Sequence, residues 1–274
     1  MKFSEVLGLD HIKNHLIKST NNGRISHAQL LSGKEGSGLL AMAIAYAQYI
    51  LASSSNNPEI SDVKCEKLMH PDLHFAFPVA TNDKIKSKPV SNLFLNEWRE
   101  FVKLKPYGNL FEWLQSIGIE NKQGQIGVDE AEQIVKALKL KSYEGGYKVM
   151  IIWMAEKMNN SASNKLLKLL EEPPKKTVFL LITEDEEQIL QTIRSRCQIL
   201  HFPPLAEAVI ADALVEKGLV REEALRLAHE ANGNFNKAID LMNKDSEDLI
   251  FEKWFVQWVR SAFKAKGNKA REQG

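Results

Sequence analysis

The chain has 274 residues, enough for two domains of about 100–200 residues each, and its 44% hydrophobic and 26% charged residues are ordinary for a soluble globular protein. A net charge of +1 excludes the global basic field of many nucleic-acid binders, so any contact with DNA must be local. Two cysteines exclude a disulfide framework and fit a reducing cytoplasm, and we find no signal peptide and no apolar run near the ~20 residues that span a membrane.

A glycine-rich turn follows the first predicted strand. Residues Ala28–Ser32 are typical of a short buried strand, and residues 33–38 read Gly-Lys-Glu-Gly-Ser-Gly. Apolar residues at helical spacing then predict a helix from Leu39 to about Leu51. A strand, a glycine turn and a helix in this order are the setting of a phosphate-binding loop.

The turn departs from the motif G-x-x-x-x-G-K-[ST] at the positions that carry its chemistry. With Gly33 and Gly38 aligned on the two motif glycines, and Gly36 between them, Leu39 stands at the lysine and Leu40 at the hydroxyl residue. The lysine neutralises the β- and γ-phosphates and the hydroxyl ligates magnesium, whereas leucine does neither. The turn is either a once-active nucleotide loop kept as scaffold or a plain glycine turn, and both interpretations predict no productive ATP site and no bound cofactor.

Residues 53–124 hold less regular signals. Ser53–Asp62 is rich in Ser, Asn and Pro and predicts a flexible loop. Cys65, His70 and His74 allow either a metal site or a solvated loop with incidental histidines; since a structural zinc site wants four protein ligands, we expect no metal. The scattered aromatics of Phe75–Gly124 allow base stacking, but without interleaved basic residues they favour an insertion packed against the sheet.

Regular patterns return after residue 127. Val128–Leu140 has the apolar spacing of an amphipathic helix, and Val149–Met154 is typical of a buried strand. A helix is predicted over Asn159–Leu170, with Asn160 or Ser161 as its cap and two prolines to stop it.

The next apolar run, Val178–Thr183, suits a parallel strand covered on both faces. A second helix is predicted to end at residues 194–197, and Gln198–Phe202 reads as a last strand.

Two strings in this region are long and specific. Residues 164–174 read Asn-Lys-Leu-Leu-Lys-Leu-Leu-Glu-Glu-Pro-Pro, and residues 192–197 read Thr-Ile-Arg-Ser-Arg-Cys. With the strand between them, they make the chain resemble the clamp-loader branch of the AAA+ ATPases, and within it the delta-prime subunits of the bacterial DNA polymerase III clamp loader. The resemblance covers residues 3–242. It implies an α/β fold in which a P-loop-type parallel-sheet domain precedes a small helical lid domain.

The resemblance also implies that further nucleotide contacts are lost. AAA+ relatives end the strand before residue 155 with Asp-Glu, which holds magnesium and polarises water, whereas this chain has Trp153 and Met154 there and Glu156 beyond. Relatives that hydrolyse ATP carry an arginine in a Gly-x-x-Arg pattern on the third lid helix, where this chain has Asn236. Thr183 stands where relatives sense the γ-phosphate.

Delta-prime relatives often carry a four-cysteine zinc module near Cys65, which one cysteine cannot form. We expect residues 1–203 to form the AAA+-like domain with its degenerate loop, 204–243 the lid, and 244–274 the start of a helical collar domain that is mostly missing. Large apolar groups crowd Asp248–Lys264, which predicts a helix that is buried or meets a partner.

The resemblance implies that the chain is a non-catalytic clamp-loader subunit. Arg196 is then an arginine finger offered to ATP on a neighbouring subunit, Ser195 helps to set the turn and Cys197 packs. From the residues alone, Arg196 also suits a surface arginine that closes a helix C-terminus.

The implied partners are the motor subunits and the delta subunit, with the sliding clamp and primer-template DNA through the assembled complex. The expected setting is a cytoplasmic DNA-directed DNA polymerase holoenzyme, in which this chain has no ATPase activity of its own. One alternative is an active ATPase motor subunit of the same ring, against which Leu39, Leu40, Trp153, Met154 and Asn236 all argue. The other is a stand-alone interaction protein that uses the apolar stretch near the C-terminus.

Overall fold

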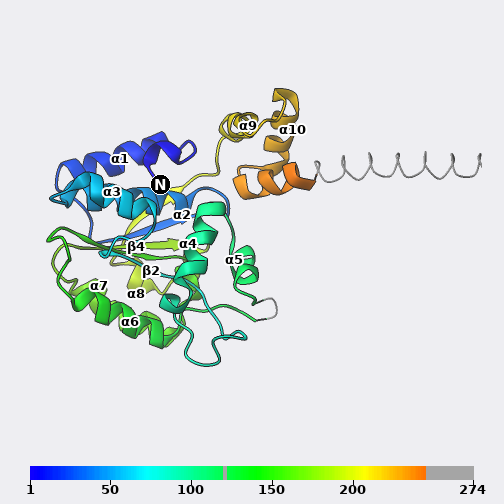
Figure 1. Ribbon diagram of the computed structural model, residues 1–274. Helices are drawn as coiled ribbons and strands as arrows, with labels where there is room; N and C mark the ends of the chain where they lie inside the picture. The colour runs from blue at the N-terminus through cyan, green and yellow to red at the C-terminus, as the bar shows by residue number, and fades with distance from the viewer. Residues whose placement is uncertain (120–121, 245–274) are drawn as a thin grey trace, which may run out of the picture.

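A parallel β-sheet lies between two layers of helices in the computed structural model, which describes residues 1–119 and 122–244 (Figure 1). Within these residues one five-stranded sheet has the order β2-β3-β4-β1-β5. The strands are β1 (Ala28–Gly33), β2 (Leu73–Ala76), β3 (Lys148–Ile152), β4 (Thr177–Thr183) and β5 (Gln198–Phe202). Every residue of β3 and β4 is buried, as expected for strands covered on both faces. The predicted apolar strands are therefore confirmed.

Helices cover both faces of the sheet. One layer holds α1 (Asp10–Asn21), α2 (Leu39–Ser54) and α3 (Pro58–Glu66), and the other holds α6 (Val128–Lys139) and α7 (Asn160–Glu171) (Figure 1). The helices α4 (Leu95–Leu104) and α5 (Leu110–Ser116) pack at one side, and the short helix α8 (Gln191–Arg194) precedes β5. Short 3-10 helices span Phe3–Glu5, Ser91–Phe94, Ala155–Lys157 and Glu186–Gln188.

Between β5 and residue 244, helices are the only regular elements. The helices α9 (Glu207–Glu216) and α10 (Arg221–Ala231) and the helical residues 235–244 form the lid, which stands at the end of the sheet that carries the turn after β1 (Figure 1). The apolar stretch 248–264 and the expected collar lie outside the described residues.

Helix α7 begins one residue earlier than its predicted caps imply. Asn159 is the cap, because its side-chain oxygen accepts a hydrogen bond from the N–H of Ala162 at 2.8 Å while its own backbone stays extended. Asn160 and Ser161 lie inside the first turn, so the prediction of either as the cap is wrong.

The flexible loop predicted over Ser53–Asp62 is also wrong. Helix α2 continues to Ser54, and α3 begins at Pro58. Proline is favoured in the first turn of a helix because the N–H that it lacks has no helical acceptor there. The same residue types that mark a loop thus mark a helix start here.

Most aromatic residues between β2 and α6 are buried and pack together. Trp98 and Trp113 are fully buried, the rings of Phe77 and Trp98 stack with centroids 4.1 Å apart, and Trp113 donates its ring N–H to the carbonyl of Pro78 at 2.8 Å. Packing is therefore the correct interpretation for the buried rings, whereas the side chain of Phe111 is 66% exposed. The strand β2, which no pattern in the sequence indicated, begins this region.

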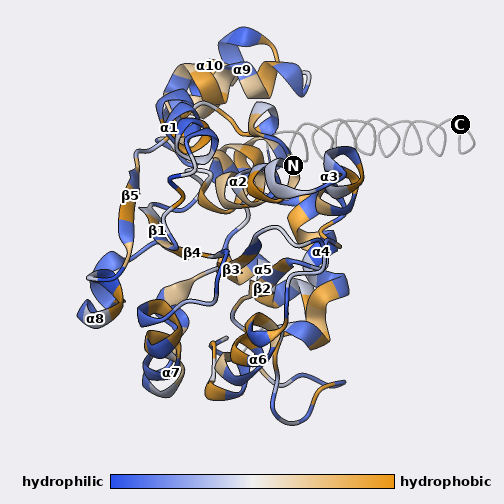
Figure 2. Ribbon diagram, turned by 90° about the vertical axis from the view of Figure 1, so that its left-hand side faces the viewer, coloured by the Kyte–Doolittle hydropathy of each residue, from blue (hydrophilic) through white to orange (hydrophobic). Residues whose placement is uncertain are grey.

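The hydropathy of the elements follows their burial: α2, which lies against the sheet, is apolar around most of its surface, while the lid helices alternate polar and apolar residues (Figure 2). In residues 1–119 and 122–244, no helix combines the length and the apolar composition that crossing a bilayer requires.

Candidate nucleotide loop and arginine site

The glycine turn has the backbone of a tight loop between a strand and a helix. Gly36 and Gly38 have φ values of 69° and 92°, in the left-handed region that favours glycine. The side-chain hydroxyl of Ser37 donates to the carbonyl of Lys34 at 2.6 Å, and α2 begins directly after Gly38. The predicted strand, turn and helix are therefore all present at the carboxyl end of β1.

The two residues that replace the motif lysine and hydroxyl belong to the hydrophobic core. Leu39 is 6% exposed and Leu40 is 4% exposed, and both lie in the cluster that packs α2 against the sheet. Neither position offers a charge or a hydroxyl to a phosphate.

Tyr107, between α4 and α5, fills the space beside the loop. Its ring carbon Cε1 lies 3.0 Å from the place that a Cβ on Gly38 would take. Its hydroxyl accepts a hydrogen bond from the N–H of Leu7 at 2.8 Å, and its ring meets Phe235 of the lid edge-on with centroids 5.0 Å apart. The tyrosine thus joins the loop, the N-terminal segment and the lid.

Little room remains beneath the loop. The cavity that the loop, Tyr107, Trp153 and Glu184 line has a volume of about 20 Å³. That is space for about one water molecule, whereas pockets that hold small ligands have volumes of about 300 Å³ or more.

The lid packs directly on the loop. The backbone N–H of Phe235 donates to the carbonyl of Gly36 at 3.1 Å, and a Cβ at Gly36 would overlap Asn234. The Asn234 side-chain amide also donates to the carboxylate of Glu35 at 3.1 Å.

Asn236, which stands where the resemblance places a sensing arginine, is 6% exposed and donates to Glu112 of α5 at 2.8 Å. It therefore serves as a contact between the lid and the body of the protein.

Buried side chains also occupy the end of β3. Trp153 and Met154 follow this strand directly and are 3% and 2% exposed. The carboxylate nearest in sequence, Glu156, accepts from the N–H of Glu184 at 3.3 Å, and burial raises its pKa. Burial, with the charges of Glu35 and Glu156, raises the pKa of Glu184 to about 7.

The residues at this end of the sheet do not fit a magnesium nucleotide. Position 39 has no ammonium group, position 40 has no hydroxyl, and the strand end has no Asp-Glu pair. Thr183 is fully buried, and its hydroxyl donates to the carbonyl of Asp185 at 3.0 Å, within its own turn.

Arg196 lies in the turn between α8 and β5 and is held at three points. Its Nη1 donates to the carbonyl of Thr192 at 2.7 Å and approaches the hydroxyl of Ser195 at 3.4 Å. Its Nη2 lies 2.7 Å from Oε1 of Glu171, the last residue of α7. The side chain of Arg196 remains 35% exposed.

The residues around Arg196 support the turn. Ser195 caps α8 and donates its hydroxyl to the carbonyl of Thr192 at 3.2 Å. Cys197 is partly buried among apolar neighbours, and burial raises the pKa of its thiol to about 11. Arg194 turns to a different partner, since its Nη1 donates to the carbonyl of Glu186 at 3.3 Å.

The arginine and the loop lie at opposite ends of the same strand pair. Gln198, at the start of β5, pairs with Gln29, while Gly33 of the loop pairs with Phe202 at the end of β5. Four residues of extended chain separate these ends by ~13 Å. Figure 2 shows α8 at the outer edge of the sheet, beside β5. Arg196 therefore does not share a site with the loop of its own chain.

The sequence model of the family described as "DNA polymerase III, delta subunit" matches residues 8–206. The delta' subunit of DNA polymerase III from Bacillus subtilis (strain 168) is 30% identical over 234 residues, which cover 84% of this chain and 58% of that protein. The chain belongs to the delta-prime family of DNA polymerase III subunits.

This delta-prime chain is also similar to a second DNA polymerase III subunit in sequence and to a solved structure in fold. The tau subunit of DNA polymerase III from Bacillus subtilis is 27% identical over 89% of this chain and 37% of its own length. The RuvB Holliday junction branch migration motor of Thermotoga maritima has a TM-score of 0.51 at 16% identity, over 92% of this chain and 66% of that one. The predicted AAA+ fold, a P-loop-type α/β domain with a helical lid, is thus confirmed. The chain spans 58% of the length of the Bacillus subtilis delta' subunit and 37% of the length of the tau subunit.

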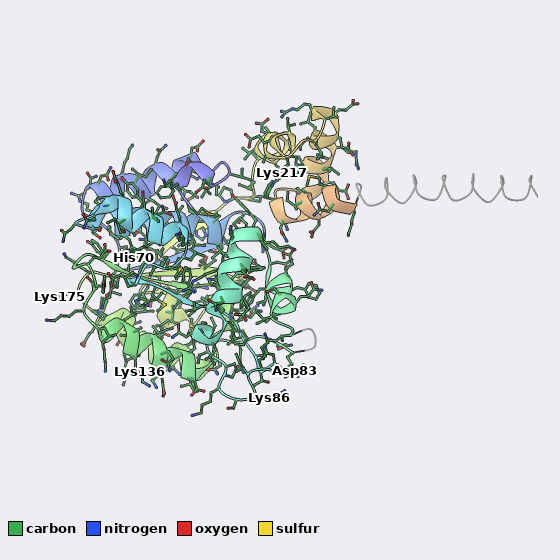
Figure 3. The ribbon with its side chains drawn as sticks, in the orientation of Figure 1. His70, Asp83, Lys86, Lys136, Lys175 and Lys217 are labelled. Atoms are coloured by element: carbon green, nitrogen blue, oxygen red, sulfur yellow. The ribbon has the colours of Figure 1, made fainter. Side chains whose placement is uncertain are left out.

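Cys65 and His70 are two of the three residues considered for a metal in this delta-prime chain. Cys65 is fully buried, and burial raises its pKa to about 12. His70, labelled in Figure 3, accepts from the N–H of Asp72 through Nδ1 at 3.1 Å and faces Glu144 at 3.6 Å through Nε2. Within the part of the chain that the structure describes, no three His, Cys, Asp or Glu side chains meet in a way that could hold a metal ion.

Sequence reasoning missed two residues of this delta-prime chain that matter at these sites. Tyr107 lies about 70 residues after the loop, within the irregular stretch Phe75–Gly124, and no local pattern connects the two. Glu171 lies inside the string that carries the resemblance, yet its contact with Arg196 bridges 25 residues and has no signature in the sequence.

Proposed function

We propose that this chain is a non-catalytic subunit of the DNA polymerase III clamp loader. In this proposal it assists ATP-dependent loading of the sliding clamp in DNA replication by offering Arg196 to ATP on a neighbouring subunit. The observation that carries the proposal is the place of Arg196, which is partly exposed in its Ser-Arg-Cys string and lies at the end of the sheet opposite to its own loop.

The proposed chemistry needs only a fixed positive charge. Charge develops on the transferred phosphoryl group in the transition state, and a positioned guanidinium neutralises it. The planar guanidinium offers paired N–H donors that match phosphate oxygens, which an ammonium does not. Ser195 holds the turn and Cys197 packs beneath it, so both act on Arg196 and not on the phosphate.

Three features support the absence of a nucleotide in this chain. Leu39 and Leu40 remove the phosphate and magnesium contacts, Tyr107 fills the adjoining space, and the remaining cavity has about 20 Å³. The proposed partners are the motor and delta subunits, with the sliding clamp and primer-template DNA contacted through the assembled complex.

The test is the clamp- and DNA-stimulated ATPase rate of reconstituted rings. Arg196→Ala should leave this subunit folded, because a surface substitution changes stability by about 0.5 kcal/mol or less. It should lower turnover at the site it faces, where loss of such an arginine costs ~10³-fold or more in GTPase systems. The bulk rate falls less, because the other sites in the ring continue to work. Arg196→Lys should rescue poorly, since lysine loses the planar fork.

Arg194→Ala is the matched control. Arg194 is two residues away, has the same charge and contacts Glu186 instead of Glu171. If Arg194→Ala and Arg196→Ala lower the rate alike, or if the Arg196→Ala ring turns over normally, Arg196 only closes a helix and the proposal fails.

A further inference from the structure

We infer that Glu171 is a positioning residue for Arg196, which orients the guanidinium toward the neighbouring subunit before ATP is engaged. This inference rests on the proposed role of Arg196 as an arginine finger and adds a second residue to it.

The contacts fix the plane of the guanidinium from two separate elements. The carbonyl of Thr192, in α8, accepts from Nη1, and the carboxylate of Glu171, at the end of α7, lies 2.7 Å from Nη2. A planar group held at both terminal nitrogens cannot rotate freely about its long side chain. These two contacts and the one to Ser195 occupy three of the five N–H donors of the guanidinium and leave two for a ligand.

The place of Glu171 in its helix argues against a role in stability. Glu171 is the last residue of α7, and the helix macrodipole makes a negative charge unfavourable at a C-terminus. The ion pair does little to compensate, because Glu171 is 47% exposed and Arg196 is 35% exposed, and such pairs add little to folding. The ion pair does restrict the orientation of the Arg196 side chain. The proposed function depends on where that side chain lies.

The contact with Thr192 lets Glu171 orient Arg196 without holding it away from its target. Its neutral carbonyl holds Nη1 from the arginine's own turn, so Glu171 has to hold only one nitrogen. An exposed carboxylate with a single charge competes weakly with the multiple charges of a triphosphate, so it does not keep the guanidinium from its target.

The expected size of the effect follows from the ordering of one side chain. Immobilising a flexible side chain at an interface costs an amount that corresponds to about 2- to 12-fold in a rate or binding constant. Without Glu171 this cost is incurred only when the transition state forms, because Arg196 can still reach its target but does so from a disordered state.

The experiment uses reconstituted rings with ATP as the substrate and measures kcat, KM and the melting temperature of the subunit. Glu171→Ala should lower kcat by about 2- to 12-fold, with KM and melting unchanged. Glu171→Gln keeps an acceptor oxygen and should rescue part of the loss. Glu172→Ala is the matched control, since Glu172 is the next residue, has the same charge and is also exposed. It should leave kcat unchanged.

A double mutant separates positioning from a general effect on structure. In a chain that already has Arg196→Ala, Glu171→Ala should have no further effect on kcat, because its target is gone. A rise in kcat with Glu171→Ala would show that Glu171 holds Arg196 away from its target. Equal losses in both backgrounds would show an effect that does not depend on Arg196. Either result overturns the inference. If Arg196→Ala lowers the rate and Glu171→Ala does not, only this inference fails. If Arg196→Ala itself has no effect, the proposed function fails and the inference fails with it.

Discussion

Tyr107 connects three parts of the molecule, and its removal tests how the space beside the loop is closed. The ring is 8% exposed and lies against Gly38 and Phe235, while the hydroxyl accepts from the N–H of Leu7. Two substitutions separate these contributions. Tyr107→Phe keeps the ring and removes only the acceptor, whereas Tyr107→Ala removes both.

The two variants should differ clearly in stability. Tyr107→Phe leaves the Leu7 N–H without its acceptor in a partly buried place, which costs about 1 kcal/mol. Tyr107→Ala adds the loss of a buried aromatic ring, and truncations of that size cost about 3–5 kcal/mol. The lost edge-on contact with Phe235, worth about 0.5–1.5 kcal/mol, is part of that cost.

Urea unfolding followed by circular dichroism measures these differences, and titration with a fluorescent ATP analogue measures nucleotide binding. We expect Tyr107→Phe to shift the unfolding midpoint slightly and Tyr107→Ala to shift it several times more. We expect no ATP binding by either variant, because Leu39 and Leu40 remain.

Equal stability of the two variants would refute the packing argument, since the ring would then contribute nothing beyond its hydroxyl. Tight ATP binding by Tyr107→Ala would refute a different step: the tyrosine alone would be closing the site, and the missing lysine and hydroxyl would not be decisive.

Three further outcomes are expected. Leu39→Lys alone should not produce ATPase activity, because Leu40, Trp153 and Met154 still lack the magnesium ligands; steady turnover by a clean preparation of this variant would contradict the reasoning. Thr183→Val should cost about 1 kcal/mol through the lost hydroxyl contacts and leave ring ATPase unchanged, whereas a large drop in turnover with unchanged melting would assign Thr183 to the reaction. Burial raises the pKa of Glu130 to about 7, above its ordinary 4.5, so the folded state binds more protons between these values. The unfolding free energy should therefore fall as pH rises through this window, and Glu130→Gln should make the fall smaller; an unchanged pH dependence would count against a buried, protonated Glu130.

The sequence by itself determined the features that depend on neighbouring residues. The apolar runs at β3 and β4, the spacing of α6, and the strand, turn and helix around Gly33 all follow from short-range patterns, and the structure confirms each of them. The two specific strings led to the family for the same reason, because a motif is read directly from consecutive residues. The sequence also places leucine at positions 39 and 40, tryptophan at 153 and methionine at 154, and the loss of nucleotide contacts that these residues suggest stays a prediction.

Local patterns were ambiguous where one residue type serves two structures. Serine, asparagine and proline mark loops, yet they also begin helices, so the residues before Pro58 suggested a loop where α3 begins. The cap of α7 was misplaced by one residue because three consecutive positions, Asn159 to Ser161, have side chains able to cap, and only the backbone conformation selects one of them.

Only the tertiary structure decided what fills the space beside the loop and what holds Arg196. Tyr107 reaches Leu7 across 100 residues and Phe235 across more than 100, and Glu171 reaches Arg196 from the end of a different helix. Such contacts arise when the sheet brings distant loops to the same end, and nothing in the residues along the chain specifies which side chains meet there. A sequence records the chemistry of each group, but burial, charge pairing and cavity volume are properties of the groups around it, and these are set by the fold.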